Sequence, residues 1–218
     1  MRLIRDNSLT IVLMLLFAGS ITGQWISGWH VATQDAIRHG QAALTLAAYT
    51  TSPAFLSSVF ENWESEFLQM AAYVVLTAIL IQRGSSESKD PDAPPRDRDL
   101  ASQGREPGAP RALRAGRLAR ALYARSLGIV LALLFLLSFV LHWTHSAQAA
   151  AEEAIEHGEA APSAIAYLAS PQLWFESFQN WQSEFLSTAV LVVLSIFLRQ
   201  RESPESKPVA APHAQTGE

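Results

Sequence analysis

Four long apolar segments alternate with polar stretches along this chain of 218 residues. The apolar segments fall at about 9–31, 61–83, 126–146 and 179–201, and most charged residues lie between or outside them. A helix of about 20 apolar residues is long enough to cross the roughly 30 Å hydrocarbon core of a bilayer. The pattern therefore predicts an all-α integral membrane protein with four transmembrane helices.

The second half of the chain repeats the first half at a constant offset of 118 residues. Residues 8–89 align without a gap onto 126–207, and about 39 of these 82 positions are identical. We therefore interpret the chain as a tandem duplication, with a first membrane repeat at 1–89 and a second at 126–207. The matched pairs include Trp25 and Trp143, His39 and His157, Tyr49 and Tyr167, Asn62 and Asn180, and Trp63 and Trp181.

Helix boundaries can be placed within the first repeat. His39-Gly40 is typical of a helix end, because glycine is common just past the last helical residue. Ser52-Pro53 is typical of a helix start, with serine as the cap and proline in the first turn. We expect a short helix near 43–49 and one long helix at 53–83, and the second repeat predicts the same plan.

The segments outside the repeats are polar. Residues 90–110 and 208–218 are rich in Pro, Ser, Ala and charged residues and are expected to be disordered. Between them, 111–125 predicts a basic amphipathic helix, which is either solvated or lies on anionic lipid headgroups. The transmembrane segment that follows immediately favours the headgroups. The basic positions recur every third residue: Arg111, Arg114, Arg117 and Arg120.

The distribution of Lys and Arg predicts the orientation in the membrane. Fifteen of the sixteen lie at the N-terminus, in the central linker or beside the C-terminal segment, and Arg38 alone lies in a loop on the other side. The positive-inside rule therefore places both termini and the linker in the cytoplasm and the His-Gly loops on the outer side of the membrane. Two spans per repeat give both repeats the same orientation, related by a pseudo-two-fold axis along the membrane normal.

A cleavable signal peptide is the alternative for the first apolar segment. The apolar run continues beyond Gly23 through Trp25 and Trp29, which is longer than such a peptide requires. Its repeat partner also lies in the middle of the chain, where a signal peptide does not occur. Both observations favour a retained transmembrane helix.

The repeated motif Glu61–Leu68 and Gln179–Leu186 is expected at the outer end of each long helix. An acidic side chain near the membrane edge is a candidate functional residue, because its burial is costly without a partner. The structural alternative is that these carboxylates face water or cap a neighbouring helix. The candidate polar site comprises Glu66, Glu184, Asn62, Asn180, His39 and His157. The expected interface anchors are Trp63, Trp181, Trp25 and Trp143.

Catalytic and cofactor motifs are not found in the sequence. There is no cysteine, no phosphate-binding loop, no GxSxG and no HExxH. Carboxylate and imidazole groups are suitable metal ligands, but their spacing here matches no dedicated ligand motif. We therefore expect no enzyme activity, cofactor, metal or nucleic-acid partner.

The chain resembles an uncharacterised bacterial membrane-protein family, domain of unknown function family 6766. The resemblance implies a membrane location and this architecture, but no activity. We expect a non-enzymatic scaffold or accessory protein that contacts lipid and either a second copy of itself or another membrane protein. The alternative is a small oligomeric transporter or channel that uses Glu66 and Glu184. The residues that carry the resemblance are Asn7-Ser8-Leu9, Gly23-Gln24-Trp25, His39-Gly40-Gln41, Phe60–Gln69 and Gln82–Ser85.

Overall fold

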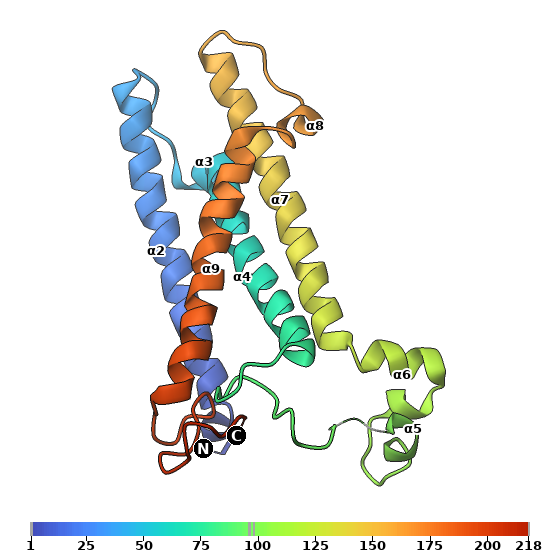
Figure 1. Cartoon of the computed structure of the whole chain (residues 1–218). Coiled ribbons are helices and arrows are strands. Elements are labelled where there is room, and N and C mark those ends of the chain that lie inside the picture. The colour runs from blue at the N-terminus through green and yellow to red at the C-terminus, as the bar shows by residue number, and fades with distance from the viewer. Residues whose placement is uncertain (1, 96, 98, 218) are drawn as a thin grey trace. The chain divides into compact units, whose positions relative to one another are not determined.

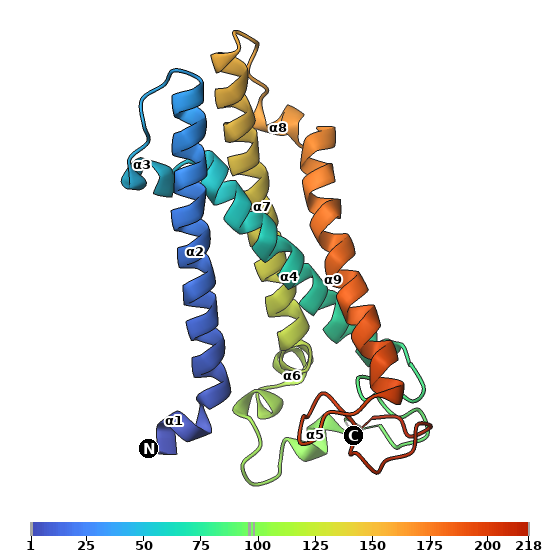
Figure 2. The same cartoon turned by 90° about the vertical axis from the view of Figure 1, so that its left-hand side faces the viewer.

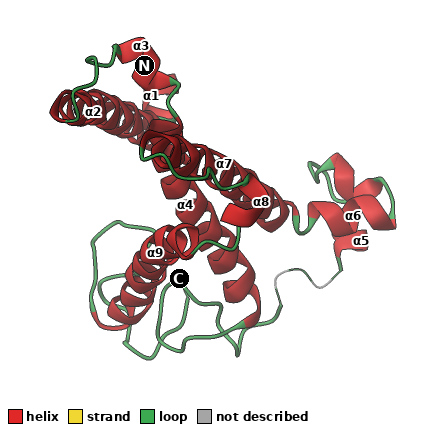
Figure 3. Ribbon diagram, turned by 90° about the horizontal axis from the view of Figure 1, so that it is seen from above, coloured by secondary structure: helices red, strands yellow, loops and turns green. Residues whose placement is uncertain are grey.

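The computed structural model describes residues 2–95, 97 and 99–217. Every regular element among these residues is a helix, and none is a strand (Figures 1 and 3). The described part of the chain is therefore all-α, as the apolar pattern predicts. Arg96 and Arg98, which belong to the expected linker, lie outside the described residues.

Four long helices dominate the chain. Helices α2 (Ser8–Arg38) and α7 (Ser126–Glu156) have 31 residues each, and α4 (Pro53–Ile79) and α9 (Pro171–Phe197) have 27 each. Helix α7 begins and ends 118 residues after α2, and α9 begins and ends 118 residues after α4. Within the described residues, α2 and α7 are long and apolar enough to cross a membrane. The shorter elements are α1 (Arg2–Asp6), α3 (Leu46–Thr50), α5 (Leu100–Gln103), the 3-10 helix η1 (Arg111–Arg114), α6 (Arg117–Tyr123) and α8 (Ala164–Tyr167).

The chain forms two compact units. Unit 1 comprises Met1–Phe60 and Leu141–Ala169, and unit 2 comprises Glu61–Val140 and Ser170–Glu218. Each unit contains segments of both sequence copies, so the units do not follow the division of the sequence into 1–89 and 126–207.

In unit 1, two tryptophans of α2 hold the loop that follows this helix and α3. Figure 2 shows how this loop leads from α2 to α3. The indole Nε1 of Trp25 donates to Thr50 Oγ1 at 2.9 Å, and that of Trp29 donates to the carbonyl of Leu44 at 2.7 Å. The loop after α2 is thus held to its own helix, since two indole N–H groups find acceptors there.

A tyrosine packs on a small residue in each half of unit 1. An ideal Cβ at Gly28 would lie 2.1 Å from the Tyr49 hydroxyl, so glycine is required for this close approach. At the positions 118 residues later, Ser146 Oγ and the hydroxyl of Tyr167 form a hydrogen bond of 3.0 Å. Both tyrosines are buried, and together they position α3 and α8.

The predicted helix boundaries at serine and glycine are confirmed. Ser52 Oγ accepts from the backbone N–H of Phe55 at 3.3 Å, and Ser170 caps α9 in the same way. Gly40 and Gly158 follow α2 and α7 with φ of 75° and 72°, which favours glycine. The short helix expected near 43–49 begins later, at Leu46, because Thr45 accepts from the Ala48 N–H and caps it.

The ends of α4 and α9 differ from the expectation. We expected one helix to continue to Arg83, but α4 ends at Ile79 and α9 ends at the equivalent Phe197. The physical reason is that serine hydroxyl groups beyond each helix accept hydrogen bonds from backbone N–H groups that would otherwise continue the helix. Ser88 Oγ accepts from the Gln82 N–H at 3.0 Å, and Ser206 Oγ accepts from the equivalent Gln200 N–H at 2.9 Å.

The structure also differs from the expected disorder of the C-terminal tail. The Lys207 side chain is 1% exposed, and its ammonium donates to several backbone carbonyls, including those of Gly84 and His213. Thr216 Oγ1 accepts from the Gly84 N–H at 2.9 Å, and the Gly217 N–H donates to the Ser85 carbonyl at 2.9 Å. The polar composition of the tail did not predict these contacts, because they depend on the single buried side chain of Lys207, from which backbone carbonyls of the tail and of Gly84 accept hydrogen bonds.

The basic segment 111–125 is not the continuous helix that its spacing predicts. It contains η1, then Gly116 with φ of 108°, and then α6. Glycine permits this positive φ, and the chain reverses there instead of extending a helix. The three-residue arginine spacing therefore does not define one helical face.

Candidate functional site

Side chains of α4 and α9 join the two copies of the repeated motif within unit 2. Asn180 Nδ2 donates to Glu61 Oε1, and Trp181 Nε1 donates to Glu64 Oε1 at 2.8 Å. Both acceptors belong to the first copy and both donors belong to the second. The motif therefore pairs two helices that are more than 100 residues apart in the sequence.

Glu64 is the most enclosed member of this pair of motifs. Its side chain is 0% exposed, although a buried carboxylate without partners costs several kcal/mol. The indole N–H of Trp181 offsets part of that cost, since hydrogen bonds to charged groups contribute about 1.5–3 kcal/mol. Trp181 is itself surrounded by rings, with centroids 6.1 Å away at Phe135, 5.4 Å at Phe178 and 6.4 Å at Trp174.

The structure places Glu66 and Glu184 in the same unit. Glu66 is exposed, Glu184 is half-buried, and their carboxylates interact electrostatically. Asn180 belongs to the bridge to Glu61, whereas Asn62 is exposed. The Glu66 carboxylate is thus close enough to affect Glu184, and a site shared by the two acids remains a prediction.

The four tryptophans expected as interface anchors all contact protein or are half-buried. Trp25 and Trp143 donate their indole N–H groups to the loops that follow their helices, at 2.9 Å and 2.7 Å. Trp181 donates to Glu64, and Trp63 is half-buried. Their role as anchors in a bilayer remains a prediction.

The two histidines of the candidate site lie in unit 1 at helix ends. His39 Nδ1 faces the Asp35 carbonyl at 3.0 Å, and His157 Nδ1 faces the Glu153 carbonyl at 2.8 Å. Both are exposed. The hydrogen bond to the Glu153 carbonyl, together with nearby carboxylates, raises the pKa of His157 above its ordinary value of 6.5. Each histidine therefore acts as part of a helix end.

These side chains do not gather into a metal site. Across the part of the chain that the structure describes, no three or more His, Asp or Glu side chains are grouped to hold a metal ion. Glu66 and Glu184 belong to unit 2, whereas His39 and His157 belong to unit 1.

A cavity of about 440 Å³ lies along α4 and α9. Two hydrogen bonds join residues of its lining: Gln69 Nε2 donates to Thr188 Oγ1, and the hydroxyl of Tyr73 donates to Glu87 Oε2 at 2.7 Å. Most of the remaining lining is aliphatic, including Leu76 and other residues of both helices. The cavity could hold an apolar group with a polar or cationic end.

Glu87 carries the carboxylate of this cavity. Burial raises the pKa of Glu87, the hydrogen bond from Tyr73 acts in the opposite direction, and the carboxylate of Glu205 raises it further. Glu205 is the equivalent of Glu87 in the second copy, at the offset of 118 residues. The cavity thus includes a protonatable group whose repeat partner influences it.

The four basic positions expected on one helix are divided between two elements. Arg111 and Arg114 belong to η1, and Arg117 and Arg120 belong to α6. Arg120 is half-buried and the other three are exposed. Arg114 and Arg120 instead line a separate pocket together with Arg105.

Sequence reasoning missed Glu61, Glu64, Tyr73 and Glu87. The second copy has Gln179 and Gln182 at the positions of Glu61 and Glu64, which argued against a symmetric role. For Glu61 and Glu64, that same difference is the signal that could have found them, since an asymmetric bridge needs its acceptors in one copy only.

The whole chain was compared with known families and proteins. Residues 1–218 match the family described as Domain of unknown function (DUF6766). The chain belongs to this family. The family resemblance that the sequence motifs of this chain indicate is therefore confirmed. The description of DUF6766 assigns no activity. No curated protein and no solved structure matches the chain.

Proposed function

We propose that this DUF6766 chain is an integral protein of the bacterial inner membrane, with four spans in two tandem parallel repeats. The equal bounds of the paired long helices, offset by 118 residues, support the repeats. The two helices that are apolar enough to cross a membrane support the location. Helices α4 and α9, at 27 residues and about 40 Å, are long enough to supply the other two spans.

Within that membrane we infer a non-enzymatic role as a scaffold or accessory protein that binds another membrane protein through α2. One observation carries this proposal. Every large apolar side chain from Leu9 to Phe17 is at least 37% exposed, and these residues cover all faces of the helix. A helix that is apolar on all sides must be covered by lipid or by another helix.

Two glycines on α2 favour another helix, instead of lipid, as the neighbour that covers its exposed apolar residues. A Cβ at Gly19 or Gly23 would meet nothing within 4 Å. Small residues at such positions let a partner backbone approach closely inside a bilayer. The partner is therefore a second transmembrane helix, from another copy of the chain or from another protein.

Photo-crosslinking tests the scaffold. A photoreactive residue is placed in turn at each position from 9 to 17 of the full chain in its native membrane. We expect one discrete protein adduct whose yield varies with the helical period of about 3.6 residues. An adduct of twice the chain mass identifies a homo-oligomer. Adducts with lipid alone at every position would overturn the proposal.

A second candidate function, a small oligomeric transporter or channel, is favoured by the cavity along α4 and α9 and by the nearness of Glu66 to Glu184. Proton and cation flux is measured in proteoliposomes for the natural chain and for Glu66→Gln with Glu184→Gln. Flux that the double substitution abolishes supports transport. No flux in either protein excludes it and leaves the scaffold.

A further inference from the structure

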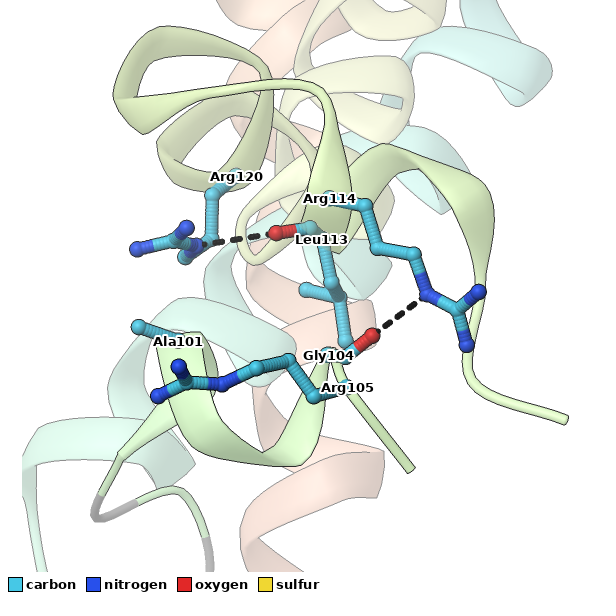
Figure 4. A pocket seen from close by; sticks show the side chains of 6 residues that line it. All are labelled: Ala101, Gly104, Arg105, Leu113, Arg114 and Arg120. Atoms are coloured by element: carbon cyan, nitrogen blue, oxygen red, sulfur yellow. Dashed lines mark hydrogen bonds between the residues drawn. The ribbon is translucent and has the colours of Figure 1, made fainter. Parts of the chain in front are cut away.

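Three arginines surround a pocket of about 420 Å³ in the segment that precedes α7 (Figure 4). The guanidinium groups of Arg105 and Arg120 extend to the same side of the pocket, and Arg114 lies across Leu113 from them. No acidic side chain is among the described residues that line it. The complete lining is Ala101, Gly104, Arg105, Leu113, Arg114 and Arg120.

Backbone carbonyls fix two of these arginines in place. Arg114 donates from Nε to the Gly104 carbonyl at 2.6 Å and from Nη2 to the Glu106 carbonyl at 2.8 Å. Arg120 donates from Nε to the Leu113 carbonyl at 3.1 Å. Since an arginine carries five N–H donors, each side chain keeps further donors for a ligand. The pocket is thus preorganised by its own backbone.

Two glycines make this arrangement possible. A Cβ on Gly104 would lie 2.9 Å from Leu113 Cβ, so glycine lets α5 and η1 approach each other. Gly116 has φ of 108°, and the reversal there returns Arg120 to the carbonyl of Leu113. A continuous helix over 111–125 would not form this pocket.

Two guanidinium groups on the same side of a pocket whose lining holds no carboxylate indicate an anionic ligand, which would compete with the Asp99 carboxylate for Arg105. Arginine donors match the geometry of phosphate oxygens in paired hydrogen bonds. Leu113 and Ala101 add an apolar wall, and the volume exceeds that of a single phosphate group. We propose that this pocket binds a phosphate ester, either as the headgroup of an anionic phospholipid or as a soluble phosphate compound.

The location favours the headgroup. The pocket segment ends at Tyr123, and α7, which is apolar enough to cross a membrane, begins at Ser126. This choice of source rests on the membrane location proposed above, whereas phosphate recognition itself does not.

Binding is measured with the full chain in nanodiscs, using glycerol 3-phosphate in neutral phosphatidylcholine discs and, separately, discs that contain phosphatidylglycerol. The test variant is Arg105→Gln with Arg120→Gln, which removes two charges from the pocket. Its matched control is Arg111→Gln with Arg117→Gln, which removes two charges from the same segment outside the pocket lining. A third variant, Gly116→Ala, disturbs the reversal and leaves every charge in place.

We expect the pocket variant to weaken binding by at least about tenfold, because the charge-assisted hydrogen bonds from two guanidinium groups to the ligand are lost. The control should change binding by less than about twofold, as expected for exposed charges. Gly116→Ala should weaken binding as the pocket variant does. Saturable binding of glycerol 3-phosphate identifies a soluble source, and binding only to phosphatidylglycerol discs identifies the headgroup.

Equal losses in the pocket variant and its control would overturn the proposal, because they indicate diffuse charge attraction. No binding to either probe would overturn it as well. The scaffold proposal is tested separately by crosslinking along α2, so the failure of one can be distinguished from the failure of the other.

Discussion

Glu64, which is 0% exposed, accepts from the Trp181 N–H and so joins the two copies of the repeat. Substituting Glu64→Ala removes the acceptor of the Trp181 N–H, and a donor without an acceptor in such surroundings costs about 1–3 kcal/mol. We expect a lower thermal midpoint of unfolding in detergent, together with a change in Trp181 fluorescence. Both are measured on the purified full chain.

The repeat supplies the matched control. Gln182 occupies the equivalent position in the second copy and is exposed. Gln182→Ala should therefore leave the thermal midpoint unchanged within the error of the measurement. Equal effects of the two substitutions would contradict the pairing of Glu64 with Trp181.

The charge state of His157 is set by the end of α7. The Glu153 carbonyl and neighbouring carboxylates stabilise the imidazolium, so the pKa lies above its ordinary value of 6.5 in the folded chain. A raised folded pKa means that the stabilisation of this helix end is fully present below 6.5 and is lost as the pH rises through the folded pKa. NMR titration should place the His157 midpoint above 6.5 in the folded chain.

Two comparisons test the cause of that shift. In denaturant the His157 midpoint should return to about 6.5, since the helix end is absent there. Glu156→Gln with Glu159→Gln should lower the folded midpoint in part, because the carbonyl contribution remains. A folded midpoint at or below 6.5 would contradict the role of the helix end.

At the residue scale, the sequence shows which positions are equivalent in the two copies, but it does not show which side chains they contact. The nearness of Glu66 to Glu184 follows from their equivalent places in the two copies. The acceptor role of Glu64 does not, because its donor is 117 residues away and is not its repeat equivalent. Partner choice depends on helix rotation, which a repeat alone does not specify.

At the level of elements, the contact between α2 and α3 depends on a missing side chain at Gly28. Gly28→Ala would bring a Cβ within 2.1 Å of the Tyr49 hydroxyl, so either α3 or the ring must move. Overpacking of this kind costs about 1–3 kcal/mol. We expect a lower thermal midpoint, which Tyr49→Phe should partly restore by removing the clashing oxygen.

In the purified chain without its proposed partner, Gly23→Ala is the matched control on the same helix, because a Cβ there meets nothing within 4 Å. It should preserve or slightly raise the thermal midpoint, since alanine favours a helix. If Gly28→Ala were as harmless as Gly23→Ala, the close approach of Tyr49 to α2 would be wrong.

Element boundaries were predictable wherever a local residue determines them. Ser52 and Gly40 set a helix start and a helix end through their own side chain or backbone conformation. The end of α4 was not predictable, because Ser88 captures the Gln82 N–H from beyond the helix. The interruption at Gly116 was not predictable either, because the regular arginine spacing indicates a continuous helix and gives no sign of the positive φ at this glycine.

At the scale of the whole chain, each compact unit combines segments of both sequence copies. The bridges from Asn180 to Glu61 and from Trp181 to Glu64 show why, because they connect the copies within unit 2. A substitution in one copy can therefore affect the other, and neither copy is expected to fold alone. Separate expression of 1–89 and 126–207 would be expected to give unstable products.

The proposed orientation in the membrane predicts which side of the membrane each loop faces. The natural chain has no cysteine, so single cysteines can report the side of the membrane without background labelling. Gln41 and Glu159 are exposed, occupy equivalent positions after α2 and α7, and should lie outside the cell; Ser102 and Ala210 are exposed and should lie in the cytoplasm. A membrane-impermeant thiol reagent should label the first pair in intact cells and the second pair only after permeabilisation. Labelling of positions 41 and 159 from opposite sides would contradict parallel repeats, because two spans must return the chain to the side on which it began.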